Sequence, residues 1–485
     1  MKHVPLWVWF LVGGVGSAGL YVGLGALIGV SGYPLDDAWI HQTYARNLAL
    51  RGEWAFVPGQ VSGGSTAPLW TVLLAPGHWL PGESYRLWTF LLGGLSLGLL
   101  AWLSAEFVRR ALPDHPWAAW AAGGLVLAEW HLVWAGASGM ETVLFSAVLM
   151  AALVLMWAEP GGVGPVAAGG LVGLAMWVRP DGLTLLPFVL AGQYLIHRQW
   201  RLLIVAGLAF GVLAAGYLGF NLVTAGEIWP TTFYAKQAEY AALRDLPLWT
   251  RAFQVGLAPL VGVVVLLAPG WVLAAVRKKW VWLLPLAWAG AYLGVFVLRL
   301  PATYQHGRYQ MPVIAMLLVT GVLGVAAVVL PNAPSAAQRI MSRAWLLSTG
   351  ALALAFFAIG ANAFVTDTRF INEEMVAAAR WLAENTQSDD LIAVHDIGAV
   401  GFFAQREIVD LAGLVSPEVI PFITDGVALQ AHIEAQGADY LMTFPDWPGY
   451  DVMVNAPGWE IVFEAEGALI RETGKQHMTI YQWRR

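Results

Sequence analysis

The chain contains no cysteine and little charge. Among its 485 residues there is no Cys, and only 12% are Asp, Glu, Lys or Arg, whereas a soluble domain carries roughly 25%. The lack of cysteine excludes disulfides, thiolate metal sites and cysteine nucleophiles. The lack of charge, with 58% hydrophobic residues and a mean hydropathy of +0.62, excludes an ordinary soluble domain. A net charge of −6 also excludes a basic surface for nucleic acid.

Apolar windows fill most of the sequence instead. A hydrocarbon core of about 30 Å requires about 20 helical residues. Eleven windows cover residues 4–30, 85–108, 117–138, 142–158, 162–178, 183–197, 201–224, 251–275, 280–299, 310–330 and 344–364. The first is longer than the h-region of a signal peptide, so we expect it to be retained as a span. The sequence predicts a mainly α, polytopic membrane bundle of about eleven transmembrane helices.

Basic residues predict the orientation of this bundle. Five clusters lie on one side if the N-terminus is cytoplasmic, as positive charge favours. They are Lys2, Arg109 with Arg110, Arg198 with Arg201, Arg277 to Lys279, and Arg339 with Arg343. An odd number of spans then places the C-terminus outside. We expect a multi-pass protein of the cell membrane with a cytoplasmic N-terminus.

Polar residues return after the last window. A helical pattern covers residues 372–384, and strand-like runs cover 391–394, 440–443, 460–463 and 478–483. We therefore expect two domains. Residues 1–365 form the membrane domain, with a large first external loop at 31–84, and residues 366–485 form a small α/β domain outside the membrane.

The first external loop begins with two adjacent carboxylates. Asp36 and Asp37 open the helix-like stretch DDAWIHQTYARNLA, and charge beside a bilayer is costly enough to need a reason. A stretch rich in Gly, Pro and Ser follows, at residues 51–70. The apolar piece 68–80 is too short to span, so we expect a re-entrant or interfacial helix there.

Other external loops contribute further charged residues next to the membrane. They are Glu141, Arg179 and Asp181, Lys236, and Arg299, His306, Arg308 and Tyr309. A carboxylate cluster beside a basic cluster suits sugar transfer from an anionic, lipid-linked donor. In this chemistry cations hold the phosphate, and a carboxylate takes the proton of the acceptor.

These motifs resemble the GT-C glycosyltransferases along the whole chain. DDAWIHQTYARNLA followed by GGSTAPLW is similar to their first-loop signature, and SGMET, RPDG, PTTFYAK, HGRYQMP and HDIGAVGFFAQREIVDLAGL resemble further blocks in the same order. The resemblance is strongest to the bacterial branch with arabinofuranosyl, aminoarabinose and mannosyl transferases. It implies a polyprenyl-phosphate-sugar donor, an external active site and a first-loop catalytic Asp, which maps to Asp36 or Asp37, with Asp36 favoured. The second external carboxylate maps to Glu141.

Each assignment has a structural alternative. Asp36 would also serve as a helix N-cap, and Glu141 could cap the span that follows it. Asp37, His41 and Tyr44 share one helical stripe, which suits a metal site, a hydrogen-bonding face or simply a wet one. Arg179 and Asp181 could form a turn-stabilising ion pair, and His395 and Asp396 could form a tight turn. Lys236, Arg299 and Arg308 could snorkel to the lipid headgroups.

Two residues lie inside an apolar window. Glu129 and His131 should face the bundle interior, because an ionised group costs about 2.5–3.5 kcal/mol at the centre of a membrane helix. A structural hydrogen bond and a role in a cavity both remain open for them.

Two classes of function fit these features. The first is a membrane glycosyltransferase that moves a sugar from a polyprenyl-phosphate donor to an extracytoplasmic glycan, lipid or protein. The second is a non-catalytic transporter or flippase of lipid-linked saccharides. Transporters usually show paired repeats or broken helices near the midplane, and the sequence shows neither clearly. Membrane lipid is an expected partner and nucleic acid is not. The sequence names no cofactor, and a divalent metal ion stays open.

Overall fold

The chain divides into two compact units, each built from separate stretches of sequence. The structure, a computed structural model, describes residues 5–326, 328 and 335–484. Unit 1 comprises Met1–Leu24, Phe90–Tyr217 and Leu243–Ala363, and unit 2 comprises Gly25–Thr89, Leu218–Ala242 and Phe364–Arg485. This division differs from the expected domains 1–365 and 366–485, because the first external loop is grouped with the C-terminal residues.

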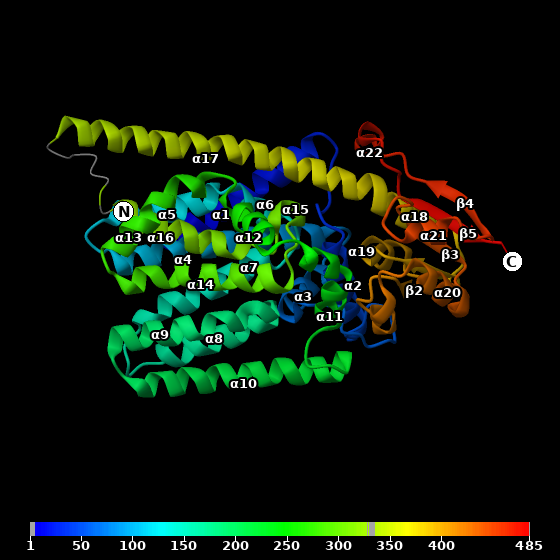
Figure 1. Cartoon of the computed structure of the whole chain (residues 1–485), viewed down its shortest axis with the longest axis horizontal. Coiled ribbons are helices and arrows are strands. Elements are labelled where there is room, and N and C mark those ends of the chain that lie inside the picture. The colour runs from blue at the N-terminus through cyan, green and yellow to red at the C-terminus, as the bar shows by residue number, and fades with distance from the viewer. Residues whose placement is uncertain (1–4, 327, 329–334, 485) are drawn as a thin grey trace. The chain divides into compact units, whose positions relative to one another are not determined.

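Unit 1 is a bundle of apolar helices (Figure 1). Its helices, some of which continue into unit 2, are α1 (Leu6–Leu27), α4 (Ser84–Ala111), α5 (Pro116–Ala128), α6 (Trp130–Ala137), α7 (Thr142–Val154), α8 (Gly164–Val178), α9 (Leu186–His197), α10 (Trp200–Ala225), α12 (Leu248–Leu257), α13 (Ala268–Val276), α14 (Trp280–Arg299), α15 (Tyr304–Gly307), α16 (Ile314–Ala326) and α17 (Ala336–Ile371). Every residue of α16 is buried, and α16 packs against α13 and α14. It is apolar on all sides, as a helix at the centre of a bundle must be.

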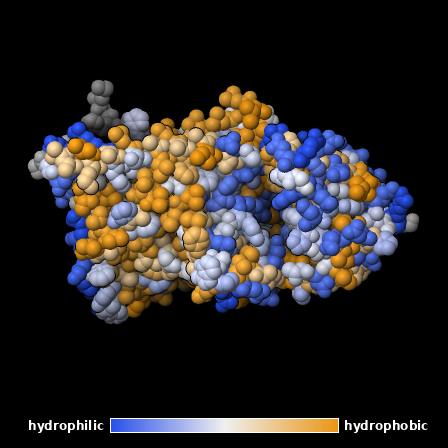
Figure 2. Space-filling view, turned by 45° about the horizontal axis from the view of Figure 1, so that its top comes forward, coloured by the Kyte–Doolittle hydropathy of each residue, from blue (hydrophilic) through white to orange (hydrophobic). Residues whose placement is uncertain are grey.

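Apolar side chains also cover the outside of this bundle. Figure 2 shows hydrophobic residues spread over the helical part and hydrophilic residues gathered over the C-terminal part. The exposed apolar residues include Leu208 and Val212 of α10, with 67% and 73% of their surface accessible. Such a surface suits lipid rather than water, which confirms the mainly helical membrane class.

The number of spans is less clear than the class. Six helices among the described residues are long and apolar enough to cross a membrane, or up to eight if each of two bent pairs counts as a span. Helices α5, α8 and α9 have 13, 15 and 12 residues, fewer than the roughly 20 that a crossing needs. The count of eleven and the orientation therefore stay predictions. Lys2 lies outside the described residues.

Two predicted windows are broken rather than straight. Window 117–138 is interrupted at Glu129, whose extended backbone separates α5 from α6. Window 251–275 bends by 93° between Leu260 and Val263, where Gly262 has a φ of 140°. A residue with a side chain rarely adopts that angle, so glycine permits the bend. The window 251–275 thus forms two helical stretches at an angle, as in a broken span or a re-entrant loop, and its assignment as a span stays a prediction.

Unit 2 contains the first external loop and the C-terminal α/β fold. Its remaining helices are α2 (Asp37–Arg51), α3 (Pro68–Leu74), α11 (Thr231–Glu239), α18 (Ala377–Asn385), α19 (Ile397–Ala399), α20 (Gly426–Gln436), α21 (Tyr450–Val454) and α22 (Ala468–Thr473). Helix α2 forms where the DDAWIHQTYARNLA stretch predicted it and ends at Gly52, which has a left-handed backbone. Helix α3 confirms a short helix within 68–80.

A five-stranded mixed sheet forms the core of the C-terminal fold. Its strands are β1 (Leu391–Val394), β2 (Glu407–Asp410), β3 (Tyr440–Thr443), β4 (Trp459–Glu464) and β5 (Thr479–Trp483), in the order β2-β1-β3-β5-β4. Strands β2, β1 and β3 are parallel, and β5 pairs antiparallel with β3 and β4. The four predicted strands are confirmed. Strand β2 was missed because its sequence, EIVD, is short and half charged.

Glycines allow close helix contact in unit 1. A Cβ atom placed on Gly324 of α16 would overlap the carbonyl oxygen of Gly270 in α13, so the two backbones touch there as small residues permit. We expect Gly324→Ala to lower the free energy of unfolding by about 1–3 kcal/mol, the usual cost of overpacking. Thermal unfolding in detergent measures it. Gly294→Ala is the matched control, since no atom lies within 4 Å of that Cβ. Equal midpoints for both variants would contradict the close contact.

Candidate active site

Asp36 is held by the backbone of the C-terminal fold. It is 8% exposed, and its carboxylate accepts hydrogen bonds from the N–H groups of Gly398, at 2.7 Å, and Ala399, at 2.8 Å. Its side chain makes no capping bond to α2, so the N-cap alternative does not hold for that helix. Asp36 instead ties the start of the first loop to the segment after β1.

The surroundings of Asp36 disfavour its charged form. Burial, assisted by the nearby carboxylates of Asp396 and Asp37, raises the pKa of Asp36 to about 8, and the two N–H donors offset this only in part. These surroundings favour the protonated form of Asp36 more than those of an ordinary carboxyl group. Both oxygens of Asp36 bind backbone N–H groups, and its catalytic role stays a prediction.

Asp37 has a different environment. Its side chain is 28% exposed, and its Oδ2 lies 3.7 Å from Nζ of Lys236, which is 20% exposed. Asp37 opens α2, where the helix dipole favours negative charge, and Lys236 lies on α11. The separation is longer than a tight ion pair, so an incoming hydroxyl or phosphate group could enter the contact. Asp37 and Lys236, predicted from separate loops, thus come together within unit 2.

A second ion pair continues along α11. Glu239 lies one turn after Lys236, and its Oε1 is 3.5 Å from Nε2 of His395, whose Nδ1 is 3.3 Å from Oδ1 of Asp396. Burial disfavours the imidazolium of His395, but the hydrogen bonds and charges of Asp396 and Glu239 outweigh it and raise its pKa to about 10. The pKa of Glu239 is lowered despite its burial because of His395. His395 therefore carries a charge at neutral pH.

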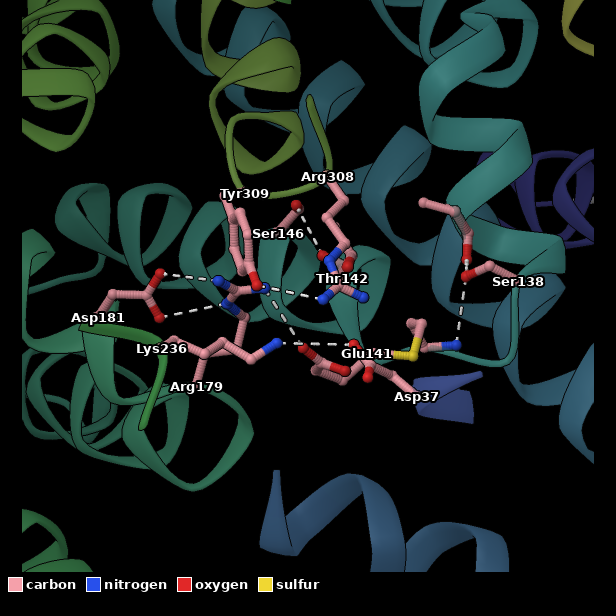
Figure 3. A network of polar contacts seen from close by, with 12 residues as sticks. Asp37, Ser138, Glu141, Thr142, Ser146, Arg179, Asp181, Lys236, Arg308 and Tyr309 are labelled. Atoms are coloured by element: carbon pink, nitrogen blue, oxygen red, sulfur yellow. Dashed lines mark hydrogen bonds and ion pairs between the residues drawn. The ribbon is translucent and has the colours of Figure 1, made fainter. Parts of the chain in front are cut away.

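Another charged group, in unit 1, surrounds Arg179 (Figure 3). Arg179 donates from Nε and Nη2 to the two oxygens of Asp181, both at 3.2 Å, and from Nη1 to Glu141 Oε1 at 3.3 Å. The hydroxyl of Tyr292 donates to Asp181 at 2.5 Å. Arg179 thus bridges two carboxylates, which agrees with the ion-pair alternative for Arg179 and Asp181. Glu141 is buried and makes no capping bond to α7.

The third predicted group lies in the turn around α15. Gln305, His306 and Gly307 have φ values of 53°, 59° and 69°, and two successive non-glycine residues in this region indicate strain of the kind that clusters at functional sites. The ring of His306 contacts Trp130 and Trp134, at 5.3 Å between centroids. The turn thus fixes the residue that follows it, Arg308.

Tyr309 lies between two guanidinium groups. That of Arg308 is 5.0 Å from its ring centroid and that of Arg179 is 5.8 Å away, and Arg308 Nη2 donates to the Tyr309 hydroxyl at 3.1 Å. Figure 3 shows the ring of Tyr309 beside both groups. Unit 1 therefore brings together the predicted residues Glu141, Arg179, Asp181, Arg308 and Tyr309. Arg299, at the end of α14, is exposed.

The pair inside the membrane window has a structural explanation. Glu129 accepts a hydrogen bond from Leu132 N at the start of α6, and its other oxygen lies 2.9 Å from His131 Nδ1. Both side chains are buried. Glu129 thus caps the helix that begins at the break, and the structural alternative for this pair agrees with the geometry.

The sequence did not predict two residues of these charged groups, Tyr292 and Glu239, and it left open whether a metal ion binds. Tyr292 lies in an apolar window, where nothing marks it, whereas Glu239 lies three residues after Lys236 and so shares its helix face. Among the residues that the structure describes, no group of three or more His, Asp or Glu side chains could hold a metal ion. The stripe of Asp37, His41 and Tyr44 contains only two residues of these types, and a divalent metal ion stays open.

The charged state of His395 has a measurable consequence. Its pKa in the folded protein is raised above the ordinary value of about 6.5, so the stabilisation is full below pH 6.5 and is lost as pH rises through 10. We expect His395→Gln to lower the unfolding midpoint at pH 7 by about 2–4 °C, the effect of about 1 kcal/mol. The difference from wild type should vanish near pH 10. A difference that is constant with pH would contradict a charged His395.

Comparisons with known proteins agree with this architecture. The family model named Domain of unknown function (DUF8728) matches residues 368–481. A search of curated proteins with the sequence gives no match. Several solved structures are similar over most of the chain. ArnT from Cupriavidus metallidurans, bound to undecaprenyl phosphate, is 14% identical with a TM-score of 0.55, over 96% of this chain and 98% of that one.

The second structure is an archaeal oligosaccharyltransferase. The enzyme from Archaeoglobus fulgidus is 12% identical with a TM-score of 0.60, over 95% of this chain and 74% of that one. A further structure of that protein, AglB, in complex with an inhibitory peptide and a dolichol-phosphate, is 14% identical with a TM-score of 0.56, over 93% of this chain and 73% of that one. At such identities the likeness concerns the fold, and the chain has the fold of the GT-C glycosyltransferases.

Proposed function

We propose that the protein is an integral membrane glycosyltransferase that moves a sugar from a polyprenyl-phosphate donor to an extracytoplasmic acceptor. The observation that carries the proposal is the pairing of Asp37 with Lys236 at the start of the first-loop helix. It supplies a partly exposed carboxylate and a cation that can exchange partners. Two structures of the same fold bind undecaprenyl phosphate and a dolichol-phosphate, which supports a donor of this chemical class.

The proposed reaction needs a base and a place for negative charge. Asp37 takes the proton of an acceptor hydroxyl while that oxygen attacks the anomeric carbon of the sugar. The bond from this carbon to the phosphate oxygen breaks, and its electron pair leaves with the polyprenyl phosphate. Because phosphate is a good leaving group, charge stabilisation by a cation suffices and a strong general acid is not required.

The cations differ in how far they are already engaged. Arg179 is bound to Asp181 and Glu141, so its charge is neutralised within unit 1, and we assign Arg179 and Asp181 a bracing role beside Tyr309. Arg308 donates to the hydroxyl of Tyr309, and Lys236 lies 3.7 Å from Asp37. We propose Arg308 and Lys236, predicted from two external loops, as separate candidates for the ligand of the donor phosphate, each tested individually. Glu141 and His306 remain proposed members of the substrate site.

One experiment tests the reaction class directly. The purified protein in lipid nanodiscs is incubated with a panel of polyprenyl-phosphate sugars together with glycan, lipid and protein acceptors that carry hydroxyl groups. Mass spectrometry follows the release of free polyprenyl phosphate. A glycosyltransferase releases the lipid phosphate from at least one donor, whereas a transporter or flippase leaves every donor intact. Intact donors throughout the panel would overturn the proposed function.

The two adjacent aspartates should behave differently. We expect Asp37→Asn to reduce transfer by about 10²-fold or more, because it removes the base and keeps the size of the side chain. Asp36→Asn should retain most activity per folded molecule but unfold at lower temperature, since an amide cannot accept both N–H bonds. Initial rates, with unfolding midpoints as the control for folding, separate the two. A folded Asp36→Asn that is inactive beside an active Asp37→Asn would return the catalytic role to Asp36.

Donor binding should depend on Arg308 or Lys236. A charge-assisted hydrogen bond contributes about 1.5–3 kcal/mol, so at least one of Arg308→Gln and Lys236→Gln should weaken binding of undecaprenyl phosphate by about tenfold to a hundredfold. Arg299→Gln is the matched control, because Arg299 is an exposed arginine at the end of α14. Binding is measured by titration in one detergent. Unchanged affinity in both folded variants would identify Arg308 and Lys236 as lipid-headgroup contacts.

A further inference from the structure

Helix α12 has an apolar face that no described part of its unit covers. Leu248, Trp249, Phe253 and Leu257 have 54%, 73%, 64% and 46% of their surface exposed. Trp249, Phe253 and Leu257 repeat at intervals of four residues, and Leu248 lies beside Trp249, so that these positions form one broad stripe along the helix. Ala252, on the same stripe, is exposed as well.

The opposite side of α12 is fixed to the bundle. Val255 is fully buried, and Arg251 donates from Nη1 to the carbonyl oxygen of Val297, in the last turn of α14, at 3.2 Å. The neighbouring residues of α14, Val295 and Leu298, have 44% and 60% of their surface exposed. The apolar stripe of α12 therefore continues an apolar surface at that end of α14.

The direction of α12 differs from that of a membrane span. The helical stretch Leu248–Leu260 and the following stretch Val263–Val276 meet at 93°. If α13 crosses the bilayer in the same direction as the other helices of the bundle, α12 runs parallel to the surface of the bilayer. A helix with Trp, Phe and Leu on one face and polar residues on the other lies stably in such a plane, with its apolar face at the boundary of headgroups and acyl chains.

We propose that α12 is a membrane-interface helix whose exposed stripe binds the bilayer itself, at the level of the lipid headgroups. The partner is lipid rather than protein, because the stripe joins the exposed apolar surface of α14. This inference does not depend on the proposed sugar transfer.

The position of α12 has a consequence for the turn that carries Arg308. The segment that follows α12, Ala258–Leu260, packs against α15, and a Cβ atom on Gly307 would lie 2.7 Å from the Cβ of Ala258. The strained turn Gln305–Gly307 therefore rests on the end of α12. An interface helix holds this turn, and Arg308 next to it, near the depth of lipid phosphates, where the phosphate of a lipid-linked donor would also lie.

Depth measurements with spin labels test the proposal. The natural chain has no cysteine, so single cysteines at Trp249, Phe253 and Leu257 are labelled without background in the full protein, in nanodiscs of phosphatidylcholine and phosphatidylglycerol. Collisions with oxygen and with a water-soluble nickel complex report the depth of each label. The matched reference set is Ile204, Leu208 and Val212 of α10, each labelled in the same way. These residues have the same spacing and are 51%, 67% and 73% exposed.

The two helices should give different profiles. A helix rises about 1.5 Å per residue, so the labels on α10 should differ in depth by about 12 Å over eight residues if that helix crosses the bilayer. The labels on α12 should lie within about 4 Å of one another, near the headgroups. A label at Tyr304, which is 53% exposed, should report a similar depth for the turn before Arg308.

Two outcomes would overturn the proposal. A depth gradient along α12 equal to that along α10 would make α12 part of a crossing span. Labels on α12 that collide with the nickel complex but not with oxygen would place the stripe in water. If a substitution prevents folding, Leu248 and Ala252 offer alternative positions on the same face. Neither result depends on transfer activity, so failure here is distinguishable from failure of the proposed function.

Discussion

The cost of placing charge beside or within a bilayer governs the arrangement of polar residues in this protein. An ionised side chain that leaves water loses far more solvation than a single contact restores. The partly buried charges of the candidate site accordingly meet partners of opposite sign or hydrogen-bond donors. Arg179 bridges Asp181 and Glu141, and His395 lies between Glu239 and Asp396. The groups that bind or activate a substrate must then be those whose contacts within the protein are weak enough to be replaced by contacts with the substrate.

This criterion separates residues that the sequence places side by side. Asp36 and Asp37 are adjacent, yet the first is enclosed by two backbone N–H donors and the second faces a lysine at 3.7 Å. Asp36 links the first loop to the segment after β1, and Glu239 links α11 to His395 in that same segment. The C-terminal fold thereby holds both elements that carry the Asp37–Lys236 pair, which gives it a part in positioning the proposed base.

The sequence predicts the helices and strands of this protein better than the contacts between residues that are distant in the chain. Apolar windows and period-two runs identify most helices and four of five strands, because local pattern decides them. The breaks at Glu129 and Gly262 could not be predicted. A carboxylate inside an apolar window does not by itself indicate a helix cap, and Gly262 is one of 53 glycines in the chain. The sequence favours Asp36 over Asp37 as the catalytic carboxylate, but it does not reveal that their environments differ. Their difference arises from Gly398 and Ala399, more than 360 residues away in the chain.

The strained turn before Arg308 is held in place by the elements around it. Left-handed backbone at Gln305 and His306 is costly and persists only where the surroundings enforce it. Here the rings of Trp130 and Trp134 hold His306, and the end of α12 supports Gly307. A cation on a flexible loop would lose much of its contact energy to ordering. A cation fixed by this turn has lost that freedom on folding, so more of its attraction for a phosphate is available for binding.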